Sequence, residues 1–141
     1  MLDDVGHLIH IDYGFLLGTS PGGNLGFETA AFKLTGEMID LMGGVESKTF
    51  RGFVGIATKA FLVARRNMSK FVTIVASFAD SGAPCFLQHP NNIHAFRNRF
   101  FPDLDELSAA AAFQMLIADA AGKWTTRAYD WIQLMQNNIK Y

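Results

Sequence analysis

The sequence predicts a mainly α fold, opened by a short β-hairpin and a long irregular loop. Apolar residues recur at helical spacing through most of the chain after residue 35. Before that point, a short apolar run is followed by a segment rich in glycine. Together these patterns predict about six helices packed into one helical unit.

The composition limits the class of protein. Half of the 141 residues are apolar, 13 are phenylalanine, and the net charge is −1. A core of useful size is therefore expected, and nothing in the charge indicates a nucleic-acid partner. The single Cys85 and the lack of a secretory leader lead us to expect a cytoplasmic protein. No apolar run approaches the ~20 residues that span a bilayer, so we expect any membrane contact to be peripheral.

The first twelve residues predict the β-hairpin. Asp4-Val5-Gly6 forms its turn, and the apolar run Leu8–Ile11 returns and ends in Asp12. A buried strand that ends in a carboxylate needs a cation for that charge, although Asp12-Tyr13-Gly14 is also compatible with an ordinary strand end. Asp3 and Asp4 are expected to be solvated at the turn. His7 and His10 lack the companions of a zinc site.

A long irregular loop is predicted over residues 15–31. It contains Pro21, Asn24 and four glycines. Loops of this length without regular structure are usually functional or disordered, and this one directly follows Asp12. Its apolar residues also allow a simpler interpretation, in which they hold the loop against the core.

The predicted helices follow in order. Thr35, Ser47 and Ser69 are expected to cap three of them, and Pro102-Asp103 to open another. The first predicted elements are a short helix from Thr35 to Gly43-Gly44, helices at Lys48–Asn67 and Lys70–Asp80, and a loop at Ser81–Asn92. A short helix then starts at Asn91 or Asn92 and ends at Phe100, another runs over Leu104–Ala121, and a final helix is capped by Thr125 or Thr126 and ends at about Asn138. The helix at residues 70–80 is expected to be largely buried.

Two surfaces leave alternatives open. Residues 48–70 carry six basic residues and no acid, which indicates a solvated face or attraction to an anionic membrane or acidic partner. The last predicted helix places Trp124 and Trp131 among basic residues. Such a helix can lie in a membrane interface or complete the core.

Several unusual segments occur in an order that resembles a known family. They are His10-Ile11-Asp12-Tyr13-Gly14, Ser20-Pro21-Gly22-Gly23-Asn24-Leu25-Gly26-Phe27-Glu28-Thr29-Ala30, Phe32-Lys33-Leu34-Thr35, Met42-Gly43-Gly44 and Thr125-Thr126-Arg127-Ala128-Tyr129-Asp130. The chain resembles the C-terminal part of a phosphatidylinositol 4-kinase catalytic domain, most closely the type III beta group. One departure is Ala31, where the family commonly has proline.

The resemblance implies a partial PI3/PI4-kinase catalytic domain over residues 1–141, the helical C-lobe of a kinase-like α+β fold with a long activation loop. It implies ATP and Mg²⁺ as cofactors. Asp12 would be the catalytic metal ligand, and Ile11 would pack beneath the adenine ring. In the family, the small lobe and the catalytic loop lie upstream, so the resemblance makes them partners of this segment and implies that the 141 residues are inactive alone.

The resemblance also implies a lipid substrate. Gly22, Gly23 and Asn24 of the loop, with Lys33, would bind phosphatidylinositol, and the enzyme would act at cytoplasmic, Golgi-type membranes. Lys33 is the one basic residue between Phe15 and Thr35, which suits a lipid whose inositol ring carries no further phosphate. The alternatives are a protein Ser/Thr kinase of the same superfamily, a phosphatidylinositol 3-kinase, and a non-catalytic helical scaffold.

Overall fold

The computed structural model describes residues 3–7, 9, 16–17, 31–87 and 91–122. These residues form helices and loops, and no strand occurs among them, which confirms the mainly helical class. The helices are α1 (Gly36–Leu41), α2 (Lys48–Arg66), α3 (Met68–Ala76), α4 (Pro84–Leu87), α5 (Asn92–Asn98) and α6 (Glu106–Gly122). The last predicted helix and half of the residues of the predicted hairpin lie outside the described residues.

Two predicted caps organise the corner between α1 and α2. The Thr35 hydroxyl accepts from the Met38 backbone N–H at 3.3 Å, and the Ser47 hydroxyl accepts from that of Phe50 at 2.9 Å. Ser47 also donates to the Met42 carbonyl at 2.6 Å, which ties the two helices together. Between them, Gly43 and Gly44 adopt φ values of 85° and 87°, a conformation that glycine adopts without a steric penalty.

The predicted start and burial of the third helix were wrong. A single residue, Asn67, separates α2 from α3, so Ser69 lies inside α3 and does not cap it. Asn67 donates through its side chain to the Val63 carbonyl at 2.9 Å and thereby ends α2. The α3 helix ends at Ala76 rather than Asp80 and buries none of its residues, and Phe71, Ile74 and Phe78 are 42%, 58% and 57% exposed.

A short helix, α4, forms where the sequence predicted only a loop. Its first residue is Pro84, whose fixed φ suits the first position of a helix. The preceding turn is held by Ser81, whose hydroxyl accepts from the Ala83 backbone N–H at 3.3 Å. Asn92 at the start of α5 donates to the Cys85 carbonyl, so α4 is fastened to the next element.

The start of α6 also differs from the prediction. Asp105, and not Asp103, opens the helix: its carboxylate accepts from the Ser108 backbone N–H at 2.9 Å and from the Ser108 hydroxyl at 2.8 Å. These hydrogen bonds favour the ionised carboxylate and lower the pKa of Asp105 below its usual value. The helix therefore begins at Glu106, two residues later than the predicted start at Leu104.

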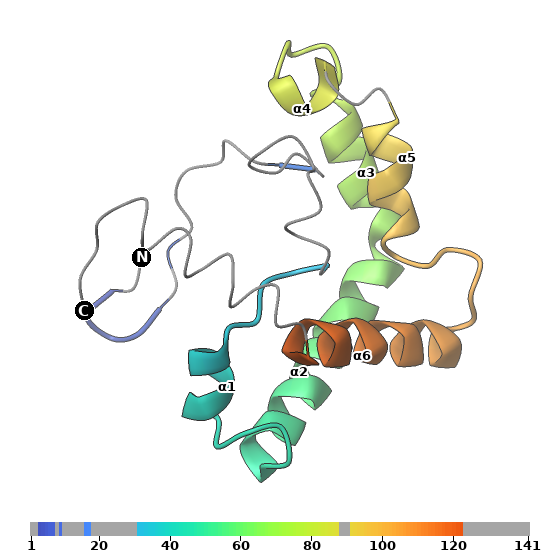
Figure 1. Cartoon of the computed structure of the whole chain (residues 1–141). Helices are drawn as coiled ribbons and strands as arrows, with labels where there is room; N and C mark the ends of the chain where they lie inside the picture. Colours follow the sequence, from blue (N-terminus) through green and yellow to red (C-terminus); the bar gives the residue numbers. More distant parts are fainter. Residues whose placement is uncertain (1–2, 8, 10–15, 18–30, 88–90, 123–141) are drawn as a thin grey trace.

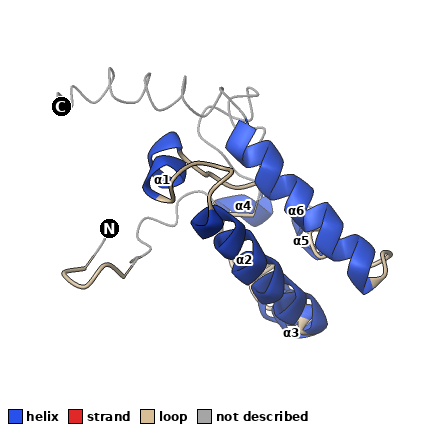
Figure 2. Ribbon diagram, turned by 90° about the horizontal axis from the view of Figure 1, so that it is seen from below, coloured by secondary structure: helices blue, strands red, loops and turns tan. Residues whose placement is uncertain are grey.

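The core lies where α6 crosses α2 (Figures 1 and 2). Leu34, Phe50, Ile117 and Ala120 are its buried residues. Ala109 of α6 is fully buried, because small side chains let two helices approach closely. Among the described residues, no helix is both long enough and apolar enough to cross a bilayer.

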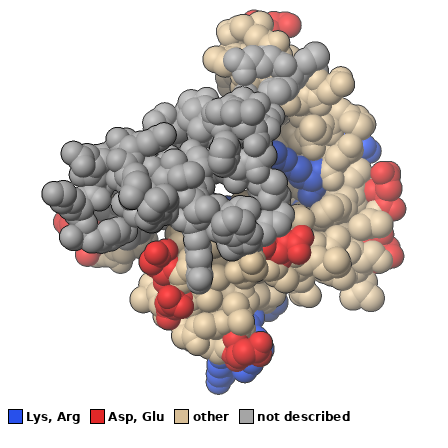
Figure 3. All heavy atoms as spheres, viewed as in Figure 1, with Lys and Arg blue, Asp and Glu red and all other residues tan. Residues whose placement is uncertain are grey.

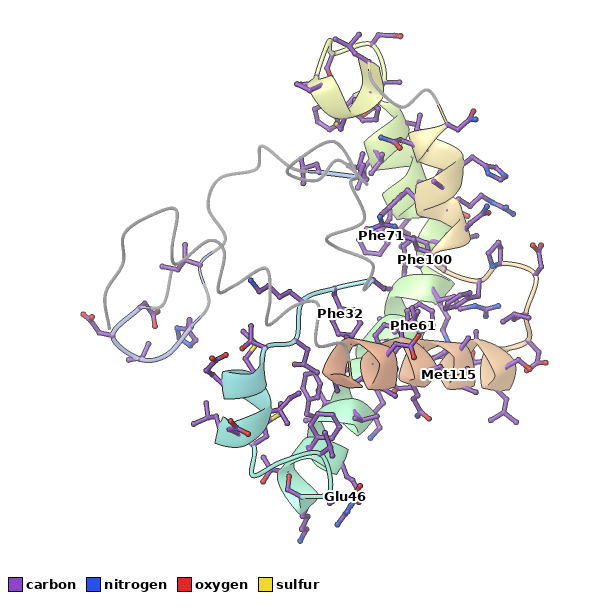
Figure 4. The ribbon with its side chains drawn as sticks, in the orientation of Figure 1. Phe32, Glu46, Phe61, Phe71, Phe100 and Met115 are labelled. Carbon is purple, nitrogen blue, oxygen red and sulfur yellow. The ribbon has the colours of Figure 1, made fainter. Side chains whose placement is uncertain are left out.

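Phenylalanine rings connect this core to its surroundings (Figure 4). Phe113 of α6 stacks on Phe61 of α2 with ring centres 4.4 Å apart, and Phe32 lies 6.4 Å from Phe113. Phe61 also meets Phe101 edge to face at 5.9 Å. The segment before α1 and the loop before α6 are thus both held against the same pair of helices.

Candidate functional site

The predicted site residues fall on both sides of the described boundary. Ile11, Asp12, Gly22, Gly23 and Asn24 lie outside the described residues, so their assignment stays a prediction. Lys33 is described, and it lies in the irregular segment that leads into α1. The structure therefore describes one of the six predicted site residues, Lys33.

Lys33 is presented to solvent between two anchored neighbours. Leu34 is buried in the core, and Phe32 packs against the ring of Phe113. Lys33, between these two anchored residues, is exposed. Figure 4 shows Phe32 directed toward the α2–α6 pair. A cation at the end of the predicted substrate loop is thus held by core packing.

The predicted basic face of α2 divides into structural and exposed groups. Arg65 donates to the backbone carbonyls of Phe100 at 3.0 Å and Phe101 at 3.2 Å, and also to that of Leu104. Arg66 forms an ion pair with Glu106 at 2.6 Å. The guanidinium of Arg66 lowers the pKa of Glu106, chiefly through a side-chain hydrogen bond. Two of the five basic residues of α2 thus join it to the segment before α6 and to the first residue of that helix, which weakens the case for a continuous anion-binding face.

The turn of the predicted hairpin is present and is held by Asp3. The Gly6 N–H donates to the Asp3 carbonyl at 3.1 Å, and Gly6 adopts a φ of 87°. The Asp3 carboxylate accepts from the backbone N–H of His7 at 2.7 Å and contacts its Nδ1 at 2.8 Å. The His7 backbone N–H contributes most to lowering the pKa of Asp3. His7 therefore pairs with a carboxylate, and no group of three potential metal ligands occurs in the described part of the chain.

A pocket that the sequence did not predict lies beside α3 and α4. It has a volume of about 400 Å³ and is lined by Leu16, Leu17, Ile74, Val75, Phe78, Ser81, Ala83, Cys85 and Phe86. Leu16 and Leu17 belong to the predicted loop, four and five residues after Asp12. The sequence shows that these two residues are apolar. It could not show the pocket, because the pocket is lined by three separate segments of the chain.

Comparison with known proteins identifies the family. The sequence profile described as "Phosphatidylinositol 3- and 4-kinase" matches residues 1–88. Phosphatidylinositol 4-kinase alpha 2 of Arabidopsis thaliana is 44% identical over 99% of this chain, which covers 27% of that protein.

Relatives of the beta type also match. Phosphatidylinositol 4-kinase beta 1 of Arabidopsis thaliana is 39% identical over 99% of this chain, which covers 13% of that protein. Phosphatidylinositol 4-kinase beta of Danio rerio is 37% identical over 99% of this chain, which covers 16% of that protein. The chain thus spans about a quarter or less of the length of these relatives. The chain belongs to the phosphatidylinositol 3- and 4-kinase family.

Proposed function

We propose that this chain supplies the helical part of a lipid kinase that transfers the γ-phosphate of ATP to the inositol 4-hydroxyl of phosphatidylinositol. The observation that carries the proposal is the similarity, over 99% of the chain, to proteins named phosphatidylinositol 4-kinase. The exposure of Lys33, just after the loop assigned to the lipid, supports it. One cation suits a phosphodiester, because each anionic group is best met by a charge-assisted hydrogen bond.

Membership of this family implies ATP as the phosphoryl donor and a divalent metal in general. We propose Mg²⁺ and assign Asp12 as its ligand within this chain, with Ile11 beneath the adenine, because Mg²⁺ prefers carboxylate oxygens. When bound, the cation neutralises charge on the phosphates of ATP. Lys33 and the backbone of residues 22–24 would then orient the inositol phosphodiester.

We also propose where the enzyme works. A kinase whose substrate is a bilayer lipid must reach a membrane surface, and we place this one peripherally on a cytoplasmic face, of the Golgi if it behaves as the type III beta group. Trp124 and Trp131 lie among basic residues in a helical pattern, which is typical of an interfacial helix. Sedimentation with anionic vesicles, with and without replacement of both tryptophans by alanine, tests the membrane contact.

The central experiment uses a composite kinase. In it, this chain replaces the matching segment of Phosphatidylinositol 4-kinase alpha 2 from Arabidopsis thaliana, which is 44% identical. Phosphorylation of phosphatidylinositol is measured with Mg-ATP on vesicles, and the product's phosphate position is determined.

In the composite kinase we expect Asp12→Asn to lower kcat by on the order of 10²-fold or more, because it removes the charge that holds the metal. Asp4→Asn is the matched control, since Asp4 is exposed at the nearby turn and should leave kcat unchanged. Activity of the Asp12→Asn variant near that of the parent would show that Asp12 is not the metal ligand. An inactive composite with an intact fold would count against the proposed function itself.

A further inference from the structure

The pocket beside α3 and α4 has the size of a ligand site. Its volume of about 400 Å³ lies within the roughly 300–1,000 Å³ of small-molecule pockets. Residues 16 and 17 form one wall, and the C-terminal half of α3 and residues 81–86 form the others. Figure 1 shows the short segment 16–17 beside α3, close to the end that leads into α4.

The lining of this pocket favours hydrocarbon. Ser81 is the one side chain of the lining with a hydroxyl, amide or charge, and its oxygen already accepts from the Ala83 N–H. Among the described residues, no buried side-chain nitrogen or oxygen lacks a hydrogen-bond partner. A peptide strand inserted here would leave its own N–H and C=O groups unpaired. A nucleotide or a sugar phosphate would find no cation. An alkyl chain has no polar group to satisfy.

The rim of the pocket is also apolar. Phe78 and Ile74 border it and are 57% and 58% exposed, and Leu87 at the end of α4 is 72% exposed. Figure 3 shows mostly uncharged residues (tan) over α4 and the adjoining end of α3. Exposed apolar surface that surrounds an apolar pocket indicates a site that meets another apolar phase.

We propose that this pocket binds an acyl chain of a membrane phospholipid. The proposal rests on the proposed function, because a kinase acting on phosphatidylinositol works at a surface where acyl chains are the abundant hydrocarbon. It also rests on position, because Leu16 and Leu17 follow Asp12 by four and five residues. The acyl chain would hold the segment after Asp12 against α3 while the enzyme is on the bilayer.

The test uses the composite kinase, and its readout needs no catalysis. The composite kinase is mixed with vesicles of phosphatidylcholine that contain a small fraction of phosphatidylcholine with a photoreactive group on its long acyl chain. After illumination, the labelled peptides are mapped by mass spectrometry. We expect label on the peptides that contain residues 16–17 and 74–86. The same group on a short-chain lipid, which cannot reach the pocket from a bilayer, should label them weakly.

A matched pair of variants makes the result specific. Ile74→Glu places a carboxylate in the pocket wall, and Ile56→Glu places one on α2, at a similarly exposed isoleucine that does not line the pocket. Labelling of the pocket peptides should fall about tenfold in the first variant, because an ionised group facing hydrocarbon is unfavourable. It should stay unchanged in the second. Ala83→Trp, which fills the pocket without a charge, should also reduce labelling, and far-UV circular dichroism checks that each variant is folded.

Several outcomes overturn the proposal. Label that survives Ile74→Glu, or that spreads evenly over exposed apolar residues such as Leu41 and Ile56, would show general adsorption to the membrane. Label that falls equally in both glutamate variants would show a charge effect alone. Labelling does not depend on phosphoryl transfer. A composite kinase that is inactive but labelled in the pocket would therefore support the acyl site and reject the proposed function. An active composite kinase without pocket labelling would support the proposed function and reject the acyl site.

Discussion

At the scale of single residues, Lys33 shows how a surface charge can be positioned by its neighbours. The side chain is exposed, whereas Leu34 beside it is 7% exposed and Phe32 packs against Phe113. Most surface lysines sample many directions, and here the backbone on both sides is anchored to the α2–α6 core. Such anchoring lowers the entropy that a contact to a lipid phosphate would otherwise cost.

This arrangement predicts the effect of Lys33→Ala in the composite kinase. We expect weaker phosphorylation of phosphatidylinositol, by about the 1.5–3 kcal/mol of a charge-assisted hydrogen bond, and nearly unchanged hydrolysis of ATP in the absence of lipid. Lys59→Ala is the control, because Lys59 is exposed on α2 and tests general attraction to the vesicle. Equal loss of both reactions would mean that Lys33 supports the fold or the nucleotide site.

At the scale of elements, two adjacent arginines at the end of α2 have different roles. Arg65 is partly buried and donates hydrogen bonds to backbone carbonyls of the segment between α5 and α6. Arg66 is exposed and pairs with Glu106. Ion pairs at the surface contribute little to stability. A hydrogen bond from a charged donor to a partly buried backbone carbonyl contributes more, so its loss is more costly.

We therefore expect Arg65→Ala to destabilise the chain by about 1.5–3 kcal/mol and Arg66→Ala to change its stability little. Urea unfolding followed by far-UV circular dichroism, in the same mild detergent for both variants, measures the difference. Arg65→Lys should recover only part of the lost stability. The planar guanidinium of arginine has several N–H donors in fixed directions, whereas lysine has one ammonium group that cannot reach several carbonyls at once. Equal effects of the two alanine variants would contradict the division of roles.

At the scale of the whole molecule, the described residues leave much apolar surface in contact with solvent. Exposed apolar side chains that do not line the pocket beside α3 and α4 include Leu41, Ile56, Leu107 and Met115. Monomeric soluble proteins rarely expose large contiguous apolar patches. The chain also spans about a quarter or less of the length of these relatives.

Two results are therefore expected for the isolated 141 residues. They should self-associate in detergent-free buffer, as measured by light scattering after gel filtration. They should also show no phosphorylation of phosphatidylinositol above background with Mg-ATP, because the chain spans only about a quarter or less of the length of the relatives that it matches. A monodisperse monomer would contradict the first expectation, and clear turnover would contradict the second.

The sequence alone was sufficient for features that depend on a few neighbouring residues. Thr35 and Ser47 were predicted as caps and confirmed, because each bonds to a backbone N–H three residues away. The helical period of residues 48–66 and the family itself were also predicted from the sequence. The importance of Asp12 was predicted in the same way and awaits the composite kinase.

Only the tertiary structure decided which groups meet across long separations. Arg65 reaches carbonyls 35 and 36 residues away, and Arg66 reaches Glu106 across 40 residues. The pocket joins residues 16–17 to residues 74–86, and the exposure of α3 depends on what packs beside it. Local patterns cannot specify these contacts, because each depends on how whole helices cross, and that is set by the fit of many side chains at once.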